Sequence, residues 1–506
     1  MKYFVFILCL IFSLTAKGTN YYVSTSGSNS NDGLTTLTPW QTMAKITTEG
    51  DNGTFSPGDQ ILFKKGETFE PPAQFGGMRI WAWAAHTFPS GVPGNPIVFS
   101  NYGTGALPNF VFQHPTAVDS TSTIVMSFDA VDYITIDGLS FYDTRFDASD
   151  KVRAAWTAEA ILLGESGEES NHCIVQNCYF RNIGFGVNIN GNYNTVQDCI
   201  FLDMKNVFNA PDGSDVGANP LTLGGTRNYI LRNYISGGWA YSESFGLNGG
   251  AIEFFNNCDS NVIAWNTIVD CAGVAEFGAL GGSRHCYDNI AAFNKIINCG
   301  GVSYVNVGGT FAIQPRNNQF YNNVIIENDS SRFSGPNFGE GFQDFPAPWP
   351  SLPVPEELVF NNNGSPIATT VWNLQNNIIV NYNNMDVMVS GSVSKTVHLG
   401  NLYKLSGGSA PNYTLNAGEV SSSAANWTDT TSPYPYLWNF NLINTSPARG
   451  IGEDLASVFA AYGLDYNDFS GTPVTTPYDA GILQYIVPPT YRNNYSKKNK
   501  RYQNAP

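Results

Sequence analysis

The stretch Cys173–Phe180 reads CIVQNCYF and Asn194–Phe201 reads NTVQDCIF, so the motif V-Q-[N/D]-C-x-F returns after 21 residues. With Asn177 as the anchor, Asn or Asp followed two residues later by an aliphatic or aromatic residue recurs along the chain. The recurrences are Asp137, Asn177, Asp198, Asn233, Asn266, Asn294, Asn323, Asn377 and Asn401, at intervals of 21 to 54 residues. Such periods are typical of stacked repeat units, each too small to bury its own apolar face.

Each unit has the pattern of short β-strands. Val196, Asp198 and Ile200 alternate on one face, and Gly or Asn-Gly separates the segments. Charged residues make up only 13% of the chain and Gly counts 50, which disfavours helical bundles and coiled coils. We therefore expect an all-β parallel β-helix, a solenoid in which equivalent residues stack about 4.8 Å apart. A column of Asn would hydrogen-bond along the stack, so the recurring motif is interpreted as structural.

The cysteines follow the same register. Cys178 and Cys199 each follow their anchor by one residue, and two further pairs, Cys271 with Cys299 and Cys258 with Cys286, also match between successive units. Columns of small apolar core residues are the favoured interpretation. Disulfides between stacked coils are the alternative, since this spacing does not exclude them.

The N-terminal segment suggests an exported protein, and the net charge limits its partners. Residues 1–18, MKYFVFILCLIFSLTAKG, have the n-region, apolar run and small residues of a cleaved signal peptide. No later stretch is apolar enough to insert into a membrane, so we expect a secreted or periplasmic monomer. With 25 basic and 41 acidic residues the net charge is −16, which disfavours nucleic acid as a partner.

Three segments near the N-terminus carry a resemblance to a known fold. They are YYVSTSGSNSNDG (Tyr21–Gly33), PWQTM (Pro39–Met43) and PGDQI (Pro57–Ile61), and TSPARGIG with PYDAGILQY matches near the C-terminus. The sequence resembles secreted bacterial proteins of the right-handed parallel β-helix (pectin-lyase-like) superfamily. Their relatives include polysaccharide lyases, glycoside hydrolases and proteins of unassigned role, so the resemblance implies the fold and leaves the activity open.

The resulting division of the chain has five parts. We expect an N-terminal cap and first coils at 19–109, with a helix begun near Pro39 and with Trp40 and Met43 packed against the first coil. Coils follow at 110–405, with long insertions at 206–220 and 327–366, then a closing segment at 406–486 and a polar tail at 487–506. Asn31-Asp32-Gly33 is predicted to form a tight turn, with a calcium site as the alternative.

Two glutamates form the strongest candidate for a catalytic site. The motif A-I-E-F at 251–254 returns as V-A-E-F at 274–277, which places Glu253 and Glu276 one coil apart. Two stacked carboxyl groups repel one another, so one of them should have a raised pKa, and this produces an acid and a base or nucleophile. The pair predicts a glycoside hydrolase acting on a polysaccharide or oligosaccharide.

Other residues near this pair are weaker candidates. Glu243 lies one coil earlier and is a third possible acid, while Arg284 and His285 are candidates for charge stabilisation or proton transfer. Calcium ligation by the glutamates and a purely structural role are the alternatives, and no cofactor is certain.

Aromatic residues in the insertions suit stacking on sugar rings. Trp81 and Trp83 lie in MRIWAWAAHTFPSGVPGN, Trp239 precedes Glu243, and Trp349 lies in the insertion at 327–366. We interpret these as candidate substrate-binding residues. The alternative is that they pack against the solenoid.

The rival chemistry is β-elimination on a uronic-acid polymer, which needs a basic side chain and often calcium. The candidates are Lys205, Arg227, Arg232, Lys295 and Arg316, and they form no column. A lyase therefore ranks second, and a non-catalytic glycan-binding or surface protein ranks third.

Overall fold

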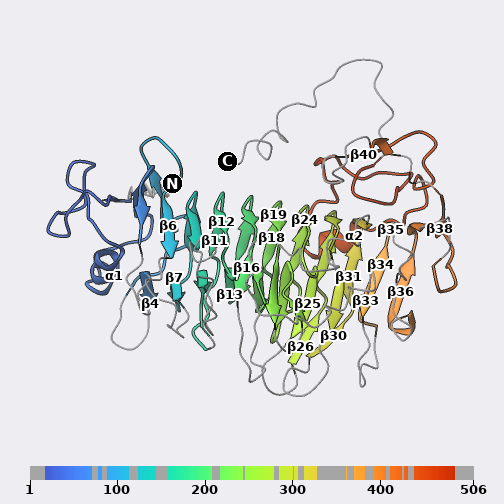
Figure 1. Ribbon diagram of the computed structural model, residues 1–506, viewed down its shortest axis with the longest axis horizontal. Coiled ribbons are helices and arrows are strands. Elements are labelled where there is room, and N and C mark those ends of the chain that lie inside the picture. The colour runs from blue at the N-terminus through green and yellow to red at the C-terminus, as the bar shows by residue number, and fades with distance from the viewer. Residues whose placement is uncertain are drawn as a thin grey trace, which may run out of the picture.

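The computed structural model is a stack of coils built from three long parallel sheets (Figure 1). It describes residues 18–70, 78–81, 88–112, 123–143, 158–165, 167–207, 217–242, 246–278, 284–299, 301–305, 313–327, 360–361, 370–381, 387, 393–405, 411–423, 425, 427–430 and 438–484. Most coils contribute one strand to each sheet, the last described coils contribute none to the third sheet, and all pairings within these three sheets are parallel. The prediction of a parallel β-helix is confirmed.

The three sheets are called A, B and C. Sheet A contains, in spatial order, β1 (Asn20–Val23), β2 (Gln60–Lys64), β5 (Ile97–Tyr102), β8 (Ile134–Asp137), β11 (Ile174–Gln176), β14 (Thr195–Gln197), β18 (Tyr229–Leu231), β23 (Val262–Ala264), β27 (Ile290–Ala292), β31 (Asn318–Tyr321), β34 (Trp372–Gln375) and β36 (Thr396–Leu399). Sheet B contains β3 (Thr68–Phe69), β6 (Asn109–Phe112), β9 (Ser140–Asp143), β12 (Tyr179–Arg181), β15 (Ile200–Leu202), β19 (Tyr234–Ser236), β24 (Thr267–Val269), β28 (Lys295–Ile297), β32 (Val324–Glu327), β35 (Ile378–Asn381), β37 (Leu402–Leu405) and β38 (Val420–Ser421). Sheet C contains β4 (Met78–Trp81), β7 (Thr123–Asp129), β10 (Ala158–Leu163), β13 (Phe185–Asn190), β17 (Asn219–Gly224), β22 (Ile252–Phe255), β25 (Ala275–Gly278), β29 (Ser303–Val305) and β33 (Phe360–Asn361).

Smaller elements lie beside these sheets. They are β16 (Lys205–Val207), β20 (Trp239–Ser242) and β21 (Gly246–Asn248) in one sheet, β26 (Arg284–Tyr287) with β30 (Ile313–Arg316), β39 (Trp427–Asp429) with β40 (Asn439–Leu442), the helices α1 (Met43–Asp51) and α2 (Ala456–Ala461), and the 3₁₀ turn η4 (Val393–Lys395).

The core is built from columns of like side chains. Phe69, Phe110, Phe141, Phe180 and Phe201 lie in register on five consecutive strands of sheet B. Neighbouring rings are stacked with centroids 4.5–5.4 Å apart. The stacking follows from the spacing of parallel strands, because residues in register repeat at the distance that suits aromatic packing.

An asparagine ladder runs along the corner between sheets A and B. Its members are buried: Asn233, Asn266, Asn294, Asn323, Asn377 and Asn401. Asn266 is typical, since its Oδ1 accepts from the backbone N–H of Asn233 at 2.8 Å and its Nδ2 donates to the carbonyl of Ile230 at 2.9 Å. The predicted hydrogen-bonding column is therefore confirmed for these positions.

The anchors Asn177 and Asp198 were assigned one residue too early, and Asp137, the register partner of Gln176, two residues too early. The backbone N–H of Cys199 donates to Asn233 Oδ1 at 3.0 Å, so Cys178 and Cys199 occupy the ladder position. Asn177 and Asp198 instead lie at the corner with φ of 54°, in the left-handed region. Because β14 ends at Gln197 and β15 begins at Ile200, the predicted alternation of Val196, Asp198 and Ile200 along one strand is wrong.

The structure contains a second asparagine ladder that was not predicted from the sequence. It runs along the corner that precedes sheet A and contains Asn194, Asn228, Asn261, Asn289 and Asn318, all buried. Cys173 precedes it in the same position, because its backbone N–H donates to Asn194 Oδ1 at 2.8 Å. Two corners of each coil are thus fixed by side chains that satisfy otherwise unpaired backbone groups.

All seven cysteines after residue 18 are buried and unbridged. Thiol groups of Cys178 and Cys199 point at backbone carbonyls, and Cys258 Sγ contacts Cys286 Sγ on the next coil. The structure agrees with the favoured interpretation of packed thiol columns rather than disulfides.

At the N-terminal end, α1 lies beyond the first coils (Figure 1). The helix begins at Met43, later than the expected start near Pro39, because the side chain of Thr42 caps it by accepting from Lys45 N–H. Trp40 and Met43 are buried against the core, as expected. The predicted tight turn forms at Gly33 (φ 74°), preceded by Asp32, whose carboxylate accepts from the Leu34 N–H.

The C-terminal segment folds back along the outside of the solenoid. Leu455, Phe459 and Val474 pack on the outer side of sheet A, in contact with residues of β23 and β27. Phe440, Leu442 and Ile482 belong to a cluster with outward residues of β28, β32 and β35 in sheet B. The outer faces of sheets A and B are thus covered over several coils by the C-terminal segment.

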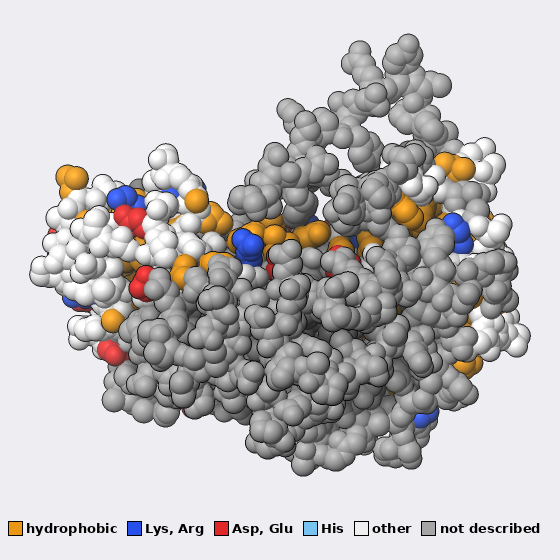
Figure 2. All heavy atoms as spheres, viewed as in Figure 1, with side chains coloured by type: hydrophobic (Ala, Val, Ile, Leu, Met, Phe, Trp, Pro, Cys, Tyr) orange, Lys and Arg blue, Asp and Glu red, His pale blue; other side chains and the backbone are white. Residues whose placement is uncertain are grey.

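Charged side chains are sparse on the described surface. In the view of Figure 2, Lys, Arg, Asp and Glu side chains of the described residues occur singly or in small groups. Among the described residues, no helix has the length and apolar composition needed to cross a membrane.

Candidate functional site

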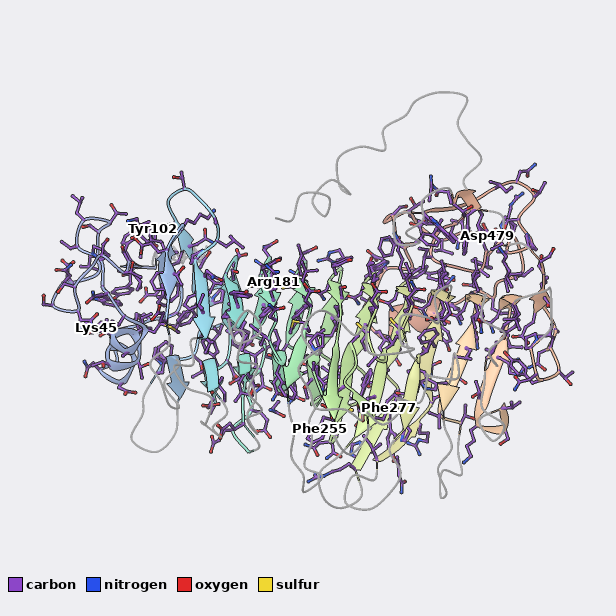
Figure 3. The ribbon with its side chains drawn as sticks, viewed as in Figure 1. Lys45, Tyr102, Arg181, Phe255, Phe277 and Asp479 are labelled. Atoms are coloured by element: carbon purple, nitrogen blue, oxygen red, sulfur yellow. The ribbon has the colours of Figure 1, made fainter. Side chains whose placement is uncertain are left out.

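Glu253 and Glu276 lie side by side on the outer side of sheet C. Their Cα atoms are register partners in the parallel pair β22–β25, as predicted from the repeated motif. Ile252 and Phe254 face the core on either side of Glu253, so the glutamate points outward by the alternation of the strand. Phe277, labelled in Figure 3, follows Glu276 and stacks on Phe254 inside the coil.

Burial shifts the proton affinity of both glutamates. It raises the pKa of Glu253 well above the ordinary carboxyl value, the nearby Glu276 raises it further, and a hydrogen bond from Asn219 opposes the shift. Burial also raises the pKa of Glu276. Two coupled carboxyls of this kind release their protons in two steps, so the pair holds one proton over the range between those steps.

Asn219 and Thr222, which the sequence analysis missed, lie on the preceding coil. Asn219 Nδ2 donates to Glu253 Oε2 at 2.7 Å, and Thr222 is the register partner of Glu253. The two side chains are only 4% and 6% exposed, yet Asn219 Oδ1 and Thr222 Oγ1 have no hydrogen-bond partner. Buried polar atoms without partners are rare, so an ordered water or a polar ligand is expected to satisfy them.

The polar surface continues toward the N-terminal coils. Glu159 of β10 has one unpartnered carboxyl oxygen, Oε1. Burial raises the pKa of Glu159 to about 8, with a further contribution from Asp129, while Asn188 opposes the shift. We use the name acidic face for a set of acidic and polar outward residues of sheet C from β7 to β25, which alternate with outward apolar residues such as Leu162 and Phe185. Its members are Asp129, Glu159, Asn188, Asn219, Thr222, Glu253 and Glu276.

A glycine keeps space open next to Glu253. Gly278 follows Glu276 by two residues on the same strand, and a Cβ placed there would lie 3.4 Å from Glu253 Oε1 and 3.6 Å from the ring of Phe255. A methyl group at this position would already be in van der Waals contact with the carboxyl group of Glu253.

The described contacts of His285 are with residues other than Glu253 and Glu276. His285 belongs to β26, its Nδ1 contacts both carboxylate oxygens of Asp259 at 2.9–3.0 Å, and its ring stacks on Tyr287. Arg284 is its neighbour on β26 and the register partner of Ile313. The described contacts do not bring His285 to the glutamates, and its role, like that of Arg284, stays a prediction.

Several other predicted site residues cannot be placed. Glu243, Trp83 and Trp349 lie outside the described residues. The backbones of Trp81 and Trp239 lie in β4 and β20, and their side chains are outside the described part. Their assignment to acid catalysis or sugar binding stays a prediction.

Four of the basic residues considered for β-elimination are held in other contacts. Arg232 makes a two-pronged ion pair with Asp198, while Arg227 donates to Tyr193 Oη. Arg316 lies over the ring of Tyr287, and Lys295 lies 4.2 Å from the ring of Phe469. Burial under the C-terminal segment lowers the pKa of Lys295 to about 8. Lys205 lies in β16, and its side chain is outside the described part.

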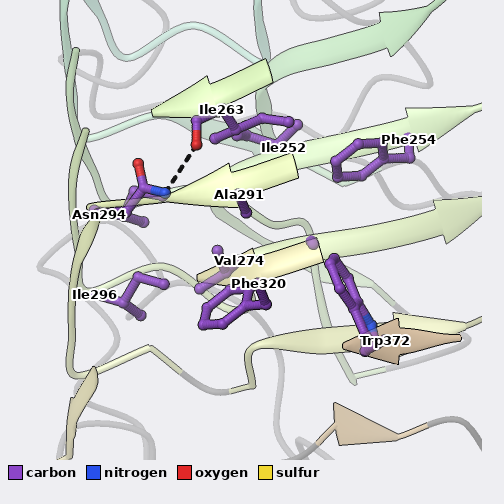
Figure 4. A pocket seen from close by; sticks show the side chains of 11 residues that line it. Ile252, Phe254, Ile263, Val274, Ala291, Asn294, Ile296, Phe320 and Trp372 are labelled. Atoms are coloured by element: carbon purple, nitrogen blue, oxygen red, sulfur yellow. Dashed lines mark hydrogen bonds between the residues drawn. The ribbon is translucent and has the colours of Figure 1, made fainter. Parts of the chain in front are cut away.

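A small cavity lies inside the coil, behind the two glutamates (Figure 4). Its lining is almost entirely apolar and includes Ile252, Phe254, Ala291, Phe320 and Trp372. Asn294, the polar member, uses its Nδ2 to bond the Ile263 carbonyl. The cavity is a packing defect of the core rather than a ligand site, because it carries no unpartnered polar group. Among the described residues, no cluster of three or more His, Cys, Asp or Glu side chains has the arrangement of a metal site.

Known structures resemble this chain in fold. The pectate lyase Pel9A matches 93% of this chain and 97% of its own length, with a TM-score of 0.50 and 16% identity. A GH136 lacto-N-biosidase from Eubacterium ramulus matches 77% of this chain and 68% of its own (TM-score 0.42, 12% identity), and a rhamnogalacturonan lyase matches 84% and 96% (0.44, 13%). No protein-family model and no curated protein sequence matches the chain. The likeness establishes the fold, a right-handed parallel β-helix.

Proposed function

We propose that this protein is a glycoside hydrolase that cleaves a polysaccharide or oligosaccharide with Glu253 and Glu276. One observation carries the proposal: the two glutamates are register partners on adjacent coils and lie side by side on a partly buried outer face of sheet C. Glycoside hydrolysis needs such a pair, one carboxyl to protonate the leaving oxygen and one to act as nucleophile or base.

The surroundings of the pair support this chemistry. Because burial and mutual repulsion raise the pKa of the carboxyls, one proton stays on the pair near neutral pH, where an ordinary glutamate would have lost it. The hydrogen bond from Asn219 orients Glu253. Strands about 4.8 Å apart favour the short carboxyl separation of retaining enzymes over the wider separation that admits an inverting water.

Substitution of each glutamate tests the assignment. On a substrate found by screening glycans for release of reducing ends, Glu253→Gln and Glu276→Gln should each lower kcat/KM by about 10²–10⁴-fold, the usual contribution of acid–base groups. Glu169→Gln is the matched control, because Glu169 is exposed and should be silent. Full activity of both correctly folded variants would refute the proposal.

β-Elimination is the second candidate, favoured by the fold shared with a pectate lyase. Products of a lyase carry an unsaturated end that absorbs ultraviolet light. Hydrolysis yields new reducing ends without this absorbance. Absorbing products from the wild-type protein would therefore favour the lyase. The contacts that occupy Arg227, Arg232, Lys295 and Arg316 argue against it.

A further inference from the structure

The acidic face has a charge pattern that bears on the class of sugar it accepts. Among the described strands of sheet C, the eight from β7 to β33 contain no Lys or Arg, and they carry Asp129, Glu159, Glu253 and Glu276. A uronic-acid or sulfated chain lying along these strands would bring further negative charge to partly buried carboxyls without a cation from these eight strands. The basic residue of sheet C, Arg79, belongs to β4, beyond β7. Buried like charges repel strongly because the surrounding dielectric constant is low.

The same face offers hydrogen-bonding atoms without partners. Asn219 Oδ1 and Thr222 Oγ1 lie one coil before Glu253, and Glu159 Oε1 lies three strands before it, about 14 Å away at the spacing of parallel strands. The hydroxyl of Thr222 both donates and accepts, and the amide oxygen of Asn219 accepts. Hydroxyl groups of sugars satisfy both kinds of atom.

We propose that the acidic face binds an uncharged glycan, which runs along sheet C from the glutamate pair toward β10 and is held by Thr222 and Asn219 on the coil before Glu253. The inference rests on the proposed function and names its substrate class. Thr222 is a binding residue for the sugar next to the cleavage point, on the side toward the N-terminal coils. The inference disfavours uronates on charge rather than on shape, because the described strands from β7 to β33 supply no Lys or Arg.

Binding to a slow variant tests the inference separately from catalysis. The full-length Glu276→Gln protein is titrated by calorimetry with uncharged hexasaccharides (cellohexaose, xylohexaose, mannohexaose and chitohexaose) and with hexagalacturonate and hexamannuronate. At least one uncharged probe should bind, and both uronates should fail to bind even though this variant has lost one acidic group. Binding of a uronate more tightly than every uncharged probe, or binding of no uncharged probe, would overturn the inference.

Thr222→Val adds a second, local readout, because valine matches threonine in shape and lacks the hydroxyl. Made in the Glu276→Gln background, it should weaken binding of the accepted glycan at least tenfold. Thr195→Val, on the outer side of sheet A, is the matched control and should leave binding unchanged. Unchanged binding by the folded Thr222→Val protein would remove Thr222 from the site. If the uncharged glycan binds as expected but both glutamate variants keep full activity, the substrate class stands and the proposed hydrolysis fails.

Discussion

At the scale of single residues, the glutamate pair gains its chemistry from its surroundings. An isolated glutamate has a pKa near 4.3, and one proton must remain on the pair for acid catalysis. Burial beside another carboxyl raises the pKa of both groups. The folded protein therefore holds these protons more tightly than the unfolded chain does. The resulting contribution to the free energy of unfolding is lost as the pH rises through the raised pKa values.

The activity should show a bell-shaped dependence on pH. Below the lower pKa of the pair both carboxyls are protonated and the base is lost, and above the higher pKa both are ionised and the acid is lost. Since both pKa values are raised, each limb of the kcat/KM profile should lie above the pH range of ordinary carboxyls. A profile with its acid limb near pH 4 would contradict the buried pair.

Removal of the Asn219 amide should move one limb of that profile. The hydrogen bond from Asn219 stabilises the ionised form of Glu253, so Asn219→Ala should raise the pKa of Glu253 and shift its limb to higher pH. A shift of the alkaline limb would identify Glu253 as the acid, and a shift of the acid limb would identify it as the base or nucleophile. An unmoved profile would show that the amide does not act on the reacting pair.

The asparagine ladder makes a separate prediction about stability. Asn266→Ala leaves the backbone N–H of Asn233 and the carbonyl of Ile230 without their present partners inside the protein. At about 1–3 kcal/mol for each buried unsatisfied group, the free energy of unfolding should fall by about 3 kcal/mol. Urea denaturation followed by circular dichroism measures this loss.

Asn177→Gly is the control for the ladder. It removes an exposed hydrogen bond to Asp137, and glycine accepts the positive φ of this position without strain. The variant should unfold at nearly the wild-type urea concentration. An equal loss in both variants would mean that a buried ladder asparagine contributes no more to the free energy of unfolding than the exposed Asn177.

At the scale of strands and corners, the sequence predicted that the coils repeat, but it did not predict which residue of each repeat occupies the buried ladder. The recurrence of Asn233, Asn266 and Asn294 was enough to identify stacked coils, and the repeated motif at 251–254 and 274–277 aligned Glu253 with Glu276. The recurrence did not separate the corner residue from the ladder residue, because Asn177 carries the same side chain as the ladder and also suits the left-handed conformation. Asn219 and Thr222 were missed because no sequence motif repeats around them and only the register of β17 with β22 brings them to Glu253.

The cavity behind the glutamates shows one column where packing is incomplete. Ala291 lies in register between Ile263 and Phe320, two much larger side chains, so the column narrows at this coil. Ala291→Val should fill part of the cavity and raise the free energy of unfolding by about 1 kcal/mol, since each buried methylene contributes about 0.8 kcal/mol. Thermal unfolding provides the measurement.

Ala292→Val is the matched control on the same strand. Ala292 is fully buried on the other side of β27, within the cluster that includes Phe459, and it does not line the cavity behind the glutamates. Extra volume there should strain the packing and lower the melting temperature. If Ala291→Val were also destabilising, the cavity would be too rigid to accept a side chain.

At the scale of the whole molecule, the C-terminal segment and the acidic face divide the surface of the solenoid. The segment covers outer residues of sheets A and B over several coils, and the strands of sheet C carry Asp129, Glu159, Glu253 and Glu276. A polar outer face on sheet C is compatible with the same repeat because each strand alternates between a core side chain and an outer one. The stabilising cover and the candidate site therefore use different faces of the same coils.

This division predicts that stability and activity respond to different substitutions. Phe459 of α2 is fully buried and packs on Phe293 and Tyr466, with ring centroids 5.4 and 4.7 Å away. Phe459→Ala should lower the free energy of unfolding by about 3–5 kcal/mol, the usual cost of removing a core aromatic ring. Well below the melting temperature, kcat/KM should stay at the wild-type value, because the ring contacts sheet A and the glutamates lie on sheet C.

Ser457→Ala, an exposed position of the same helix, controls for changes in helix propensity and should leave both quantities unchanged. Melting followed by circular dichroism gives the stability, and initial rates at low temperature give the activity. A parallel fall of activity and stability in Phe459→Ala would show that the C-terminal segment also holds the geometry of the glutamate pair. Retained activity in a protein that melts early would show instead that the coils position Glu253 and Glu276 through their own register.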